Sequence, residues 1–361
     1  MNEPMKSRPP YFKDDDPDAS DETPGPYDGE SAEDGLWFLP GPDPDAGGEA
    51  DPFAPPLPQA PRQALFDLGD WRAAEAALAQ PLADLALDLG RLVERAEAMG
   101  PGAAERLAQE EAAALSWWTG DRILADRIAL WQSSRIGAAG EDGGALIRTA
   151  WAARRLAATR AAGQGRAAAI AAHLGFETGL PSGLAEDFAA LLPSPEELGP
   201  VATGCLAFHL WRALHERPAH LRDIEAAVLG ARIGTETAAP GFLPLALAGI
   251  GALLAGGPVE RRLAAWLAGA HNAVLSALMT LDLLRRWRAR AEAATADLSG
   301  RTPGLLTGAL LRRPMAAMPQ LVSETGASRP ALLRNLAIFE QRELVREVTG
   351  QGRFRVWAAR Y

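Results

Sequence analysis

From residue 64 to residue 298 apolar side chains recur every three or four positions, which is the spacing of one helix face. The segment "DWRAAEAALAQPLADLALDLGRLVERAEAMG" shows it well, with a stripe formed by Leu82, Leu85, Leu89, Leu92 and Val93. Sustained apolar–polar alternation, the mark of strands, is missing before residue 344. Apolar residues make up 48% of the chain, enough for a real core. The sequence therefore predicts a mainly α fold, with a helical domain over residues 64–298.

The longest apolar run, "GFLPLALAGIGALLAGG", extends from Gly241 to Gly257. It is shorter than the roughly 20 residues that a membrane span needs, and Pro244 interrupts it. We predict a buried core helix here, with a membrane-associated segment as the alternative. The N-terminal "MNEPMKSRPPYFKDDD" lacks the apolar stretch of a secretory signal. We expect a soluble cytoplasmic protein with no membrane partner.

Residues 1–61 differ in composition from the rest of the chain. They are rich in Asp, Glu, Pro and Gly, and residues 1–50 contain 14 acidic and three basic residues. Such a segment cannot bury enough apolar area to offset the entropy lost on ordering. We predict a disordered acidic tail. Its one apolar patch, "GLWFLP" at residues 35–40, is either a short docking motif or an incidental cluster.

The last sixty residues have the opposite charge. Residues 301–361 contain ten arginines and four acidic residues in a chain whose net charge is −10. Local signals predict a first helix in "TPGLLTGALLRRP", ended by Pro314, and a second in "PQLVSETG", with Pro319 in its first turn. Gly326 is placed where the second helix must turn, because glycine adopts a positive φ at little cost.

A third helix is predicted to follow that turn. Ser328 is suited to cap its N-terminus, and Pro330 to occupy its first turn. Leu332, Leu336 and Phe339 recur at i, i+4 and i+7 and predict its buried face. The opposite face is predicted to carry Pro330, Leu333 and Arg334, with Arg329 at the N-terminal end.

After Leu344 the period changes from helical to two. The arms "LVREVTG" and "RFRVWAA" flank the turn "GQG" at residues 350–352, which predicts a β-hairpin. Three helices followed by a hairpin are typical of a winged helix-turn-helix domain, here residues 299–361. In such domains the third helix enters the major groove of DNA and the hairpin lies along the backbone.

This arrangement predicts binding to double-stranded DNA. The expected contacts lie in the third helix and in the hairpin: Ser328, Arg329, Pro330, Leu333, Arg334, Gln351, Arg353 and Arg355. Arg342 and Arg346 are instead expected to pair with nearby glutamates. Winged helices also serve as protein-interaction modules or structural caps, and these remain the alternatives for residues 299–361.

Two segments resemble a known group of proteins. They are "RLAQEEAAALSWWTGDRILADRIALWQSSRIG", residues 106–137, and "ASRPALLRNLAIFEQRELVREVTGQGRFRVWAA", residues 327–359. The chain resembles a family of uncharacterised proteins, frequent on plasmids and chromosomes of rhizobia and related alphaproteobacteria, that join an α-helical domain of unknown function to a C-terminal helix-turn-helix. The resemblance implies a DNA-binding C-terminus, and hence a transcriptional or plasmid-associated regulator. It implies no reaction for the helical domain.

The segment "ALSWWTGDRI" is also similar to the early helix and turn of Fic-type nucleotidyl-transferases. Their defining loop begins His-Pro-Phe and continues through Gly-Asn-Gly-Arg. Here His271-Asn272 is followed by "AVLSAL", with no glycine nest for phosphate. We expect no enzymatic activity. A degenerate relative of these transferases, or a protein-interaction scaffold, is the alternative function.

Other chemical motifs give weaker signals. The sequence contains no P-loop, Rossmann glycine fingerprint or HExxH. Cys205 and His209 are spaced i, i+4 and could supply two zinc ligands, but packed core is the favoured interpretation. Trp117-Trp118 is expected in the core, with a stacking platform for a ligand as the alternative, and Glu110-Glu111 is expected to be one exposed and one half-buried carboxylate. We predict no cofactor and no metal site.

We expect the helical domain to assist DNA binding by the C-terminal domain, through dimerisation or through binding of an effector. Palindromic operators contain two half-sites, and single modules bind weakly, so a homodimer is predicted. The apolar helices of residues 240–290 are the expected source of dimer contacts. Binding of an unknown effector is the second role predicted for this domain.

Overall fold

The chain is mainly helical, in agreement with the sequence prediction. All the residues described below belong to one compact unit of the computed structural model, Gln59–Tyr361. The predicted tail at residues 1–61 and the hairpin turn at residues 350–352 lie outside the described residues. The structure describes residues 67–134, 142–158, 165–174, 183–214, 218–235, 241–349 and 355–361.

Eleven described helices precede residue 299, and three helices and three short strands follow it. The first group is α1 Leu68–Ala77, α2 Ala79–Met99, α3 Pro101–Thr119, α4 Ala125–Ser134, α5 Gly143–Ala157, α6 Arg166–His173, α7 Leu184–Leu191, α8 Pro200–Leu214, α9 Ala219–Ile233, α10 Gly251–Leu254 and α11 Val259–Ala294. The second group is α12 Thr302–Arg312, β1 Ala316–Ala317, α13 Met318–Thr325, α14 Arg329–Gln341, β2 Val345–Glu347 and β3 Val356–Ala359. We call the first group the body and the second the C-terminal element.

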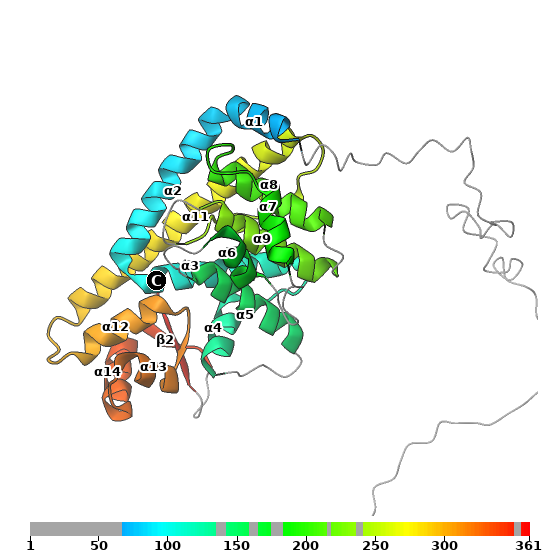
Figure 1. The fold of residues 1–361 in the computed structure, drawn as a ribbon. Helices are drawn as coiled ribbons and strands as arrows, with labels where there is room; N and C mark the ends of the chain where they lie inside the picture. The colour runs from blue at the N-terminus through cyan, green and yellow to red at the C-terminus, as the bar shows by residue number, and fades with distance from the viewer. Residues whose placement is uncertain are drawn as a thin grey trace, which may run out of the picture. The chain divides into compact units, whose positions relative to one another are not determined.

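The 36-residue helix α11 organises the body. Helix α2 runs beside it (Figure 1), and the predicted stripe of α2 is buried in the shared core at Leu85, Leu89 and Leu92. Polar pairs link the two helices, since Arg95 Nη1 lies 3.1 Å from Asp282 Oδ2. The apolar spacing predicted the stripe of α2, and the structure shows that α11 is the helix on which it packs.

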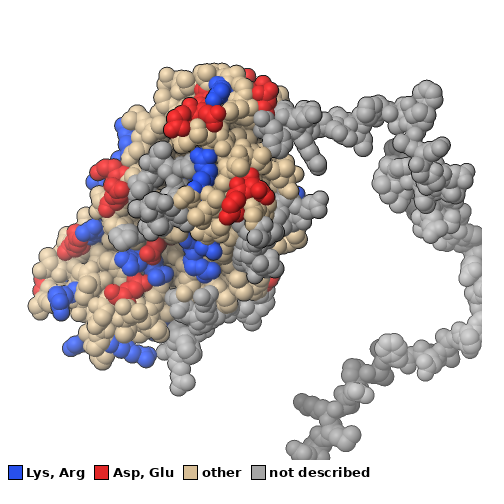
Figure 2. All heavy atoms as spheres, viewed as in Figure 1, with Lys and Arg blue, Asp and Glu red and all other residues tan. Residues whose placement is uncertain are grey.

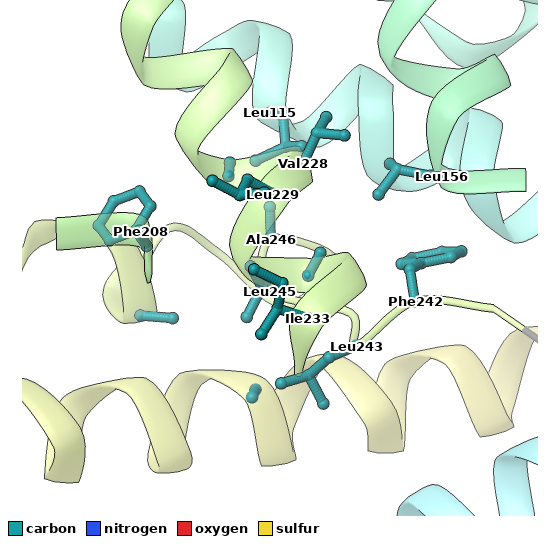
Figure 3. Close-up of a cluster of buried hydrophobic side chains, with 14 of the residues drawn as sticks. Leu115, Leu156, Phe208, Val228, Leu229, Ile233, Phe242, Leu243, Leu245 and Ala246 are labelled. Carbon is teal, nitrogen blue, oxygen red and sulfur yellow. The ribbon is translucent and has the colours of Figure 1, made fainter. Parts of the chain in front are cut away.

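The centre of the body brings together side chains from helices far apart in the sequence. Figure 3 shows Leu115 of α3, Phe208 of α8 and Val228 of α9 in one cluster, which also contains Leu243 from the segment after α9. Helices α8 and α9 approach closely at Gly204. A Cβ atom built on Gly204 would lie 2.6 Å from the carbonyl oxygen of Gly230, so only glycine permits this contact.

The predicted helix over residues 241–257 is wrong. Residues 242–250 contain no helix, and only α10 forms, at Gly251–Leu254. Glu111 of α3 is fully buried, and its Oε1 accepts hydrogen bonds from the backbone N–H groups of Leu245 at 2.8 Å and Ala246 at 2.9 Å. In a helix these two N–H groups would donate to backbone carbonyls. Here they donate to a carboxylate that is 134 and 135 residues away along the chain.

The predictions for Trp117 and Glu111 are wrong, and the prediction for Cys205 and His209 is confirmed. Trp117 is mostly exposed although the core was predicted, and Arg122 stacks over its ring at 5.9 Å. Glu111 is fully buried, whereas the sequence predicted no more than a half-buried carboxylate. Cys205 and His209 are packed in the core, as the favoured interpretation predicted. Across the described ranges, no cluster of three or more His, Cys, Asp or Glu side chains could hold a metal ion.

In the C-terminal element three helices form at the predicted places, and the strands form one small antiparallel sheet. The strand order is β1-β3-β2, with Val345 opposite Ala359 and Ala316 opposite Trp357. The sequence predicted the β2–β3 hairpin but missed β1. The chain order of the element is therefore α12–β1–α13–α14–β2–β3.

Candidate nucleic-acid interface

A tight turn joins α13 to α14. Gly326 follows α13 in the left-handed region, with φ of 65°, and its N–H donates to the carbonyl of Val322. Ser328 caps α14, and its Oγ accepts from the N–H of Ala331 at 3.4 Å. Pro330 occupies the first turn of α14. These positions are the predicted ones, because capping and positive φ depend on the local sequence.

One face of α14 is buried and the other is open. Leu332, Leu336 and Phe339 pack into the core of the C-terminal element. The predicted contact residues of this helix, which are Ser328, Arg329, Pro330, Leu333 and Arg334, are all exposed. The outer surface of the first two turns is therefore accessible to a partner.

Four arginines of the C-terminal element are neutralised by carboxylates. Arg313 pairs with Glu324, and Arg360 Nη1 lies 3.1 Å from Glu343 Oε1. Arg342 pairs with Asp297, and its hydrogen bond lowers the pKa of the Asp297 carboxyl below the ordinary value. The fourth is Arg355. These arginines hold the fold together and add no uncompensated positive charge.

Arg355 lies in a network of its own. Its Nη2 is 3.2 Å from Glu340 Oε1 and its Nε is 3.9 Å from Glu347 Oε2. Its guanidinium also stacks 5.1 Å from the centre of the Trp357 ring, and Trp357 Nε1 donates to Glu340 at 2.9 Å. Contact with a phosphate would require Arg355 to exchange these partners.

The remaining described arginines of this element form no ion pair with a described carboxylate: Arg301, Arg312, Arg329, Arg334 and Arg346. Arg346 was expected to pair with a glutamate, yet it is exposed on the edge strand β2. The sequence could not show that Arg346 stays unpaired, because the alternation of residues along a strand does not tell which arginine a nearby carboxylate binds.

The N-terminal half of α14 is the more positive end. Arg329 and Arg334 are in its first two turns, where the helix dipole and the free N–H groups also favour an anion. Glu340 and Glu343 lie at the opposite end, paired with Arg355 and Arg360. Figure 2 shows basic side chains at the lower left of the view, over the position of α13 and α14 in Figure 1.

Helices α11 and α4 of the body contribute side chains to the core of the C-terminal element and to its sheet. Trp287 and Ala291 of α11 belong to the core of the C-terminal element, and Trp287 Nε1 donates to the carbonyl of Leu344 at 2.8 Å. Leu130 of α4 packs against the sheet at Val356. Both α11 and α4 therefore contribute contacts to the C-terminal element.

A cavity of about 360 Å³ opens beside this contact. Its lining comes from α2, α3, α11, α12 and α13, and includes Met99, Gly304, Gly308, Arg288 and Arg312. A small molecule in this cavity could touch both the body and the C-terminal element. Its lining contains both signs of charge, since Glu292 and Glu324 line it as well as Arg288 and Arg312.

Two predicted contacts, Gln351 and Arg353, lie outside the described residues. A scan of the chain against models of protein families finds no match. A search of curated proteins finds no significant match either.

Proposed function

We propose that the chain is a DNA-binding regulator and that its C-terminal element is a winged helix-turn-helix with α14 as the recognition helix. The order α12–β1–α13–α14–β2–β3 is that of such a domain. The three-residue connection Gly326–Ser328 with its positive φ suits a helix-turn-helix.

The observation that carries the proposal is the exposure of Arg329 and Arg334, unpaired among the described residues, on the first two turns of α14. Arg301, Arg312 and Arg346 form no ion pair with a described carboxylate either, but none of them lies on this helix, and the other four described arginines of the element are neutralised by carboxylates. In helix-turn-helix proteins this end of the helix contacts base edges. Arginine there can donate two hydrogen bonds to guanine.

The proposed role of the hairpin is to neutralise phosphate. Arg346 is exposed on the edge strand and is the most accessible described arginine of the hairpin. Arg355 is a weaker candidate because Glu340 and Glu347 already bind it. Arg353 remains a candidate from the sequence.

The test uses the full-length chain, because Trp287 belongs to the core of the C-terminal element and a fragment from residue 299 would lack it. Full-length protein is first mixed with random-sequence duplex DNA in low salt, and bound sequences are selected over repeated rounds. We expect enrichment of a common motif, and weaker binding by the double variant Arg329→Ala/Arg334→Ala.

The matched control is Arg72→Ala/Arg91→Ala on α1 and α2. It removes the same charge from exposed positions of the body. Equal loss of binding by both double variants would show that only net charge matters. Absence of binding at about 50 mM salt, where non-specific contacts are strong, would contradict the proposal and favour a protein partner for α14.

A further inference from the structure

The outward face of α11 carries no charged side chain for about five turns. Between Arg262 and Asp282 the helix contains no Asp, Glu, Lys or Arg. Its inward side is buried against α1, α2, α8 and α10, which explains the apolar residues there. Described residues leave the outward side uncovered, so burial within the body does not explain the lack of charge on it.

Large apolar side chains stand on this outward side. Leu275, Met279 and Leu283 are 40%, 69% and 47% exposed and recur every four residues, so they form one ridge of the helix. Leu254 of α10 is also exposed, and α10 packs directly on α11, where a Cβ atom on Gly269 would lie 2.5 Å from the backbone N of Ala252. We call the three α11 residues the apolar ridge. Large exposed apolar side chains that recur on one face of a helix are typical of an interaction surface.

We propose that the apolar ridge binds a second copy of this chain in an antiparallel two-fold pair. The ridge is symmetric about Met279, with a leucine one turn to each side. In an antiparallel pair Met279 therefore meets Met279 of the second copy, and Leu275 meets Leu283. Two ridges with four-residue spacing interdigitate in the commonest class of helix packing. Two-fold symmetry requires a self-complementary surface of this kind.

The polar residues at the ends of the ridge agree with this pairing. Asn272 lies about two turns before Met279 and Arg286 about two turns after it, and both are exposed. The two-fold axis brings Asn272 opposite Arg286 of the second copy. The amide oxygen of asparagine accepts hydrogen bonds from a guanidinium, whereas two arginines there would repel.

A membrane surface fits the same face less well. By length and composition α11 could cross a bilayer, and it is the one helix in the described part of the chain with this property. However, 44% of its apolar window is buried inside the body. The inward side of α11 is packed on α1, α2, α8 and α10, so the helix cannot span a bilayer while the body is folded. A second copy covers the apolar ridge and leaves these contacts intact.

The first test compares the assembly state of full-length wild type, Met279→Glu and Leu87→Glu by sedimentation velocity over a micromolar concentration series. No DNA is present, so the result is independent of the proposed DNA binding. Leu87 is a matched control: it is 62% exposed on α2, away from the buried stripe that faces α11. We expect dimers of wild type and Leu87→Glu. Met279→Glu should dimerise about 100-fold less tightly or worse, because each dimer would bury two carboxylates.

A cross-linking test examines the symmetry directly. Met279→Cys should form a disulfide-linked dimer under mild oxidation, because residue 279 lies on the proposed two-fold axis. Leu87→Cys should stay monomeric on a denaturing gel, and the native Cys205 is buried. Monomeric wild type, or dimerisation unaffected by Met279→Glu, would overturn the proposal. Flotation of a monomeric chain with vesicles of phosphatidylglycerol and phosphatidylcholine, lost in Met279→Glu, would assign the apolar ridge to a lipid surface instead.

Discussion

The body and the C-terminal element differ in their buried arginines: among the described residues, every buried arginine lies in the body. In the body, Arg148 is buried and pairs with Asp121 at 2.6 Å, while Arg232 is buried and donates to the carbonyls of Leu156 and Gly241. In the C-terminal element, Arg329 and Arg334 lie on the surface and form no ion pair with a described residue. The number of arginines alone therefore says little about function.

The comparison teaches where to look for a binding surface in an arginine-rich chain. A buried arginine needs hydrogen-bond acceptors or a carboxylate within the fold, because leaving its charge unpaired in the core costs several kcal/mol. An arginine left unpaired on the surface costs little and keeps its donors for another molecule. The expected effects of substitution therefore separate the two groups, and the following variants test that separation.

The largest effect is expected in the body. Asp121→Ala removes a largely buried carboxylate that accepts two hydrogen bonds from the Arg148 guanidinium, and it should lower the free energy of unfolding by about 3–5 kcal/mol. Urea denaturation followed by circular dichroism measures this. The control is Glu292→Ala, which breaks an exposed pair with Arg288 and should cost less than about 0.5 kcal/mol. Equal losses in the two variants would contradict the distinction between buried and exposed arginine pairs.

A second large effect concerns the buried carboxylate of Glu111. Burial raises its pKa from 4.5 to about 7, although hydrogen bonds from the backbone of residues 245–247 oppose the shift. The folded chain therefore holds this proton more tightly than the unfolded chain does. The resulting stability is complete below pH 4.5 and is lost as pH rises towards and through 7, a change of roughly 3 kcal/mol.

Glu111→Gln tests this effect, since the amide oxygen can still accept from Leu245 and Ala246 but cannot ionise. Its stability should fall less than that of wild type between pH 5 and 8. Denaturation at several pH values gives the two curves. Parallel curves would show that the Glu111 carboxyl titrates alike in the folded and unfolded chains.

An intermediate effect is expected where the two regions meet. Trp287→Phe removes the N–H that donates to Leu344, but the N–H of Arg360 still donates to the same carbonyl. The expected loss is about 1–2 kcal/mol, measured by thermal unfolding. Trp117→Phe is the control, since that ring is mostly exposed and its loss should change little. Equal effects would contradict the role of Trp287 in joining α11 to the C-terminal element.

The sequence predicted the C-terminal element well because its signals are local. Ser328 caps its own helix, Gly326 ends the preceding one, and each effect depends on residues within one turn. The open face of α14 followed from the same spacing. The ion pairs of Arg346 and Arg355 were harder to predict from the sequence. Which of these arginines pairs with Glu340 or Glu347 depends on how β3 packs on α14.

The errors in the body have a common cause in contacts between distant residues. Glu111 accepts hydrogen bonds from the backbone N–H groups of residues 245 and 246, and the apolar run at residues 242–250 forms no helix although its sequence resembles one. Trp117 lies near the end of the mostly apolar stretch of α3 at residues 112–118, and its spacing could not show which of the two tryptophans meets solvent. Strand β1 has two residues and exists only because β3 pairs with it.

The most direct test of the account is the salt dependence of duplex DNA binding, measured by fluorescence anisotropy on full-length wild type and Arg329→Ala/Arg334→Ala. Wild type should show a log–log slope steeper than about −3, because several phosphates are neutralised. The double variant should bind more weakly than wild type, with a slope shallower by up to about 2 if both arginines contact phosphate. Its stability should match that of wild type, since neither arginine has a partner among the described residues. Identical affinity and slope for the two proteins would contradict the assignment of α14 as the DNA-binding helix.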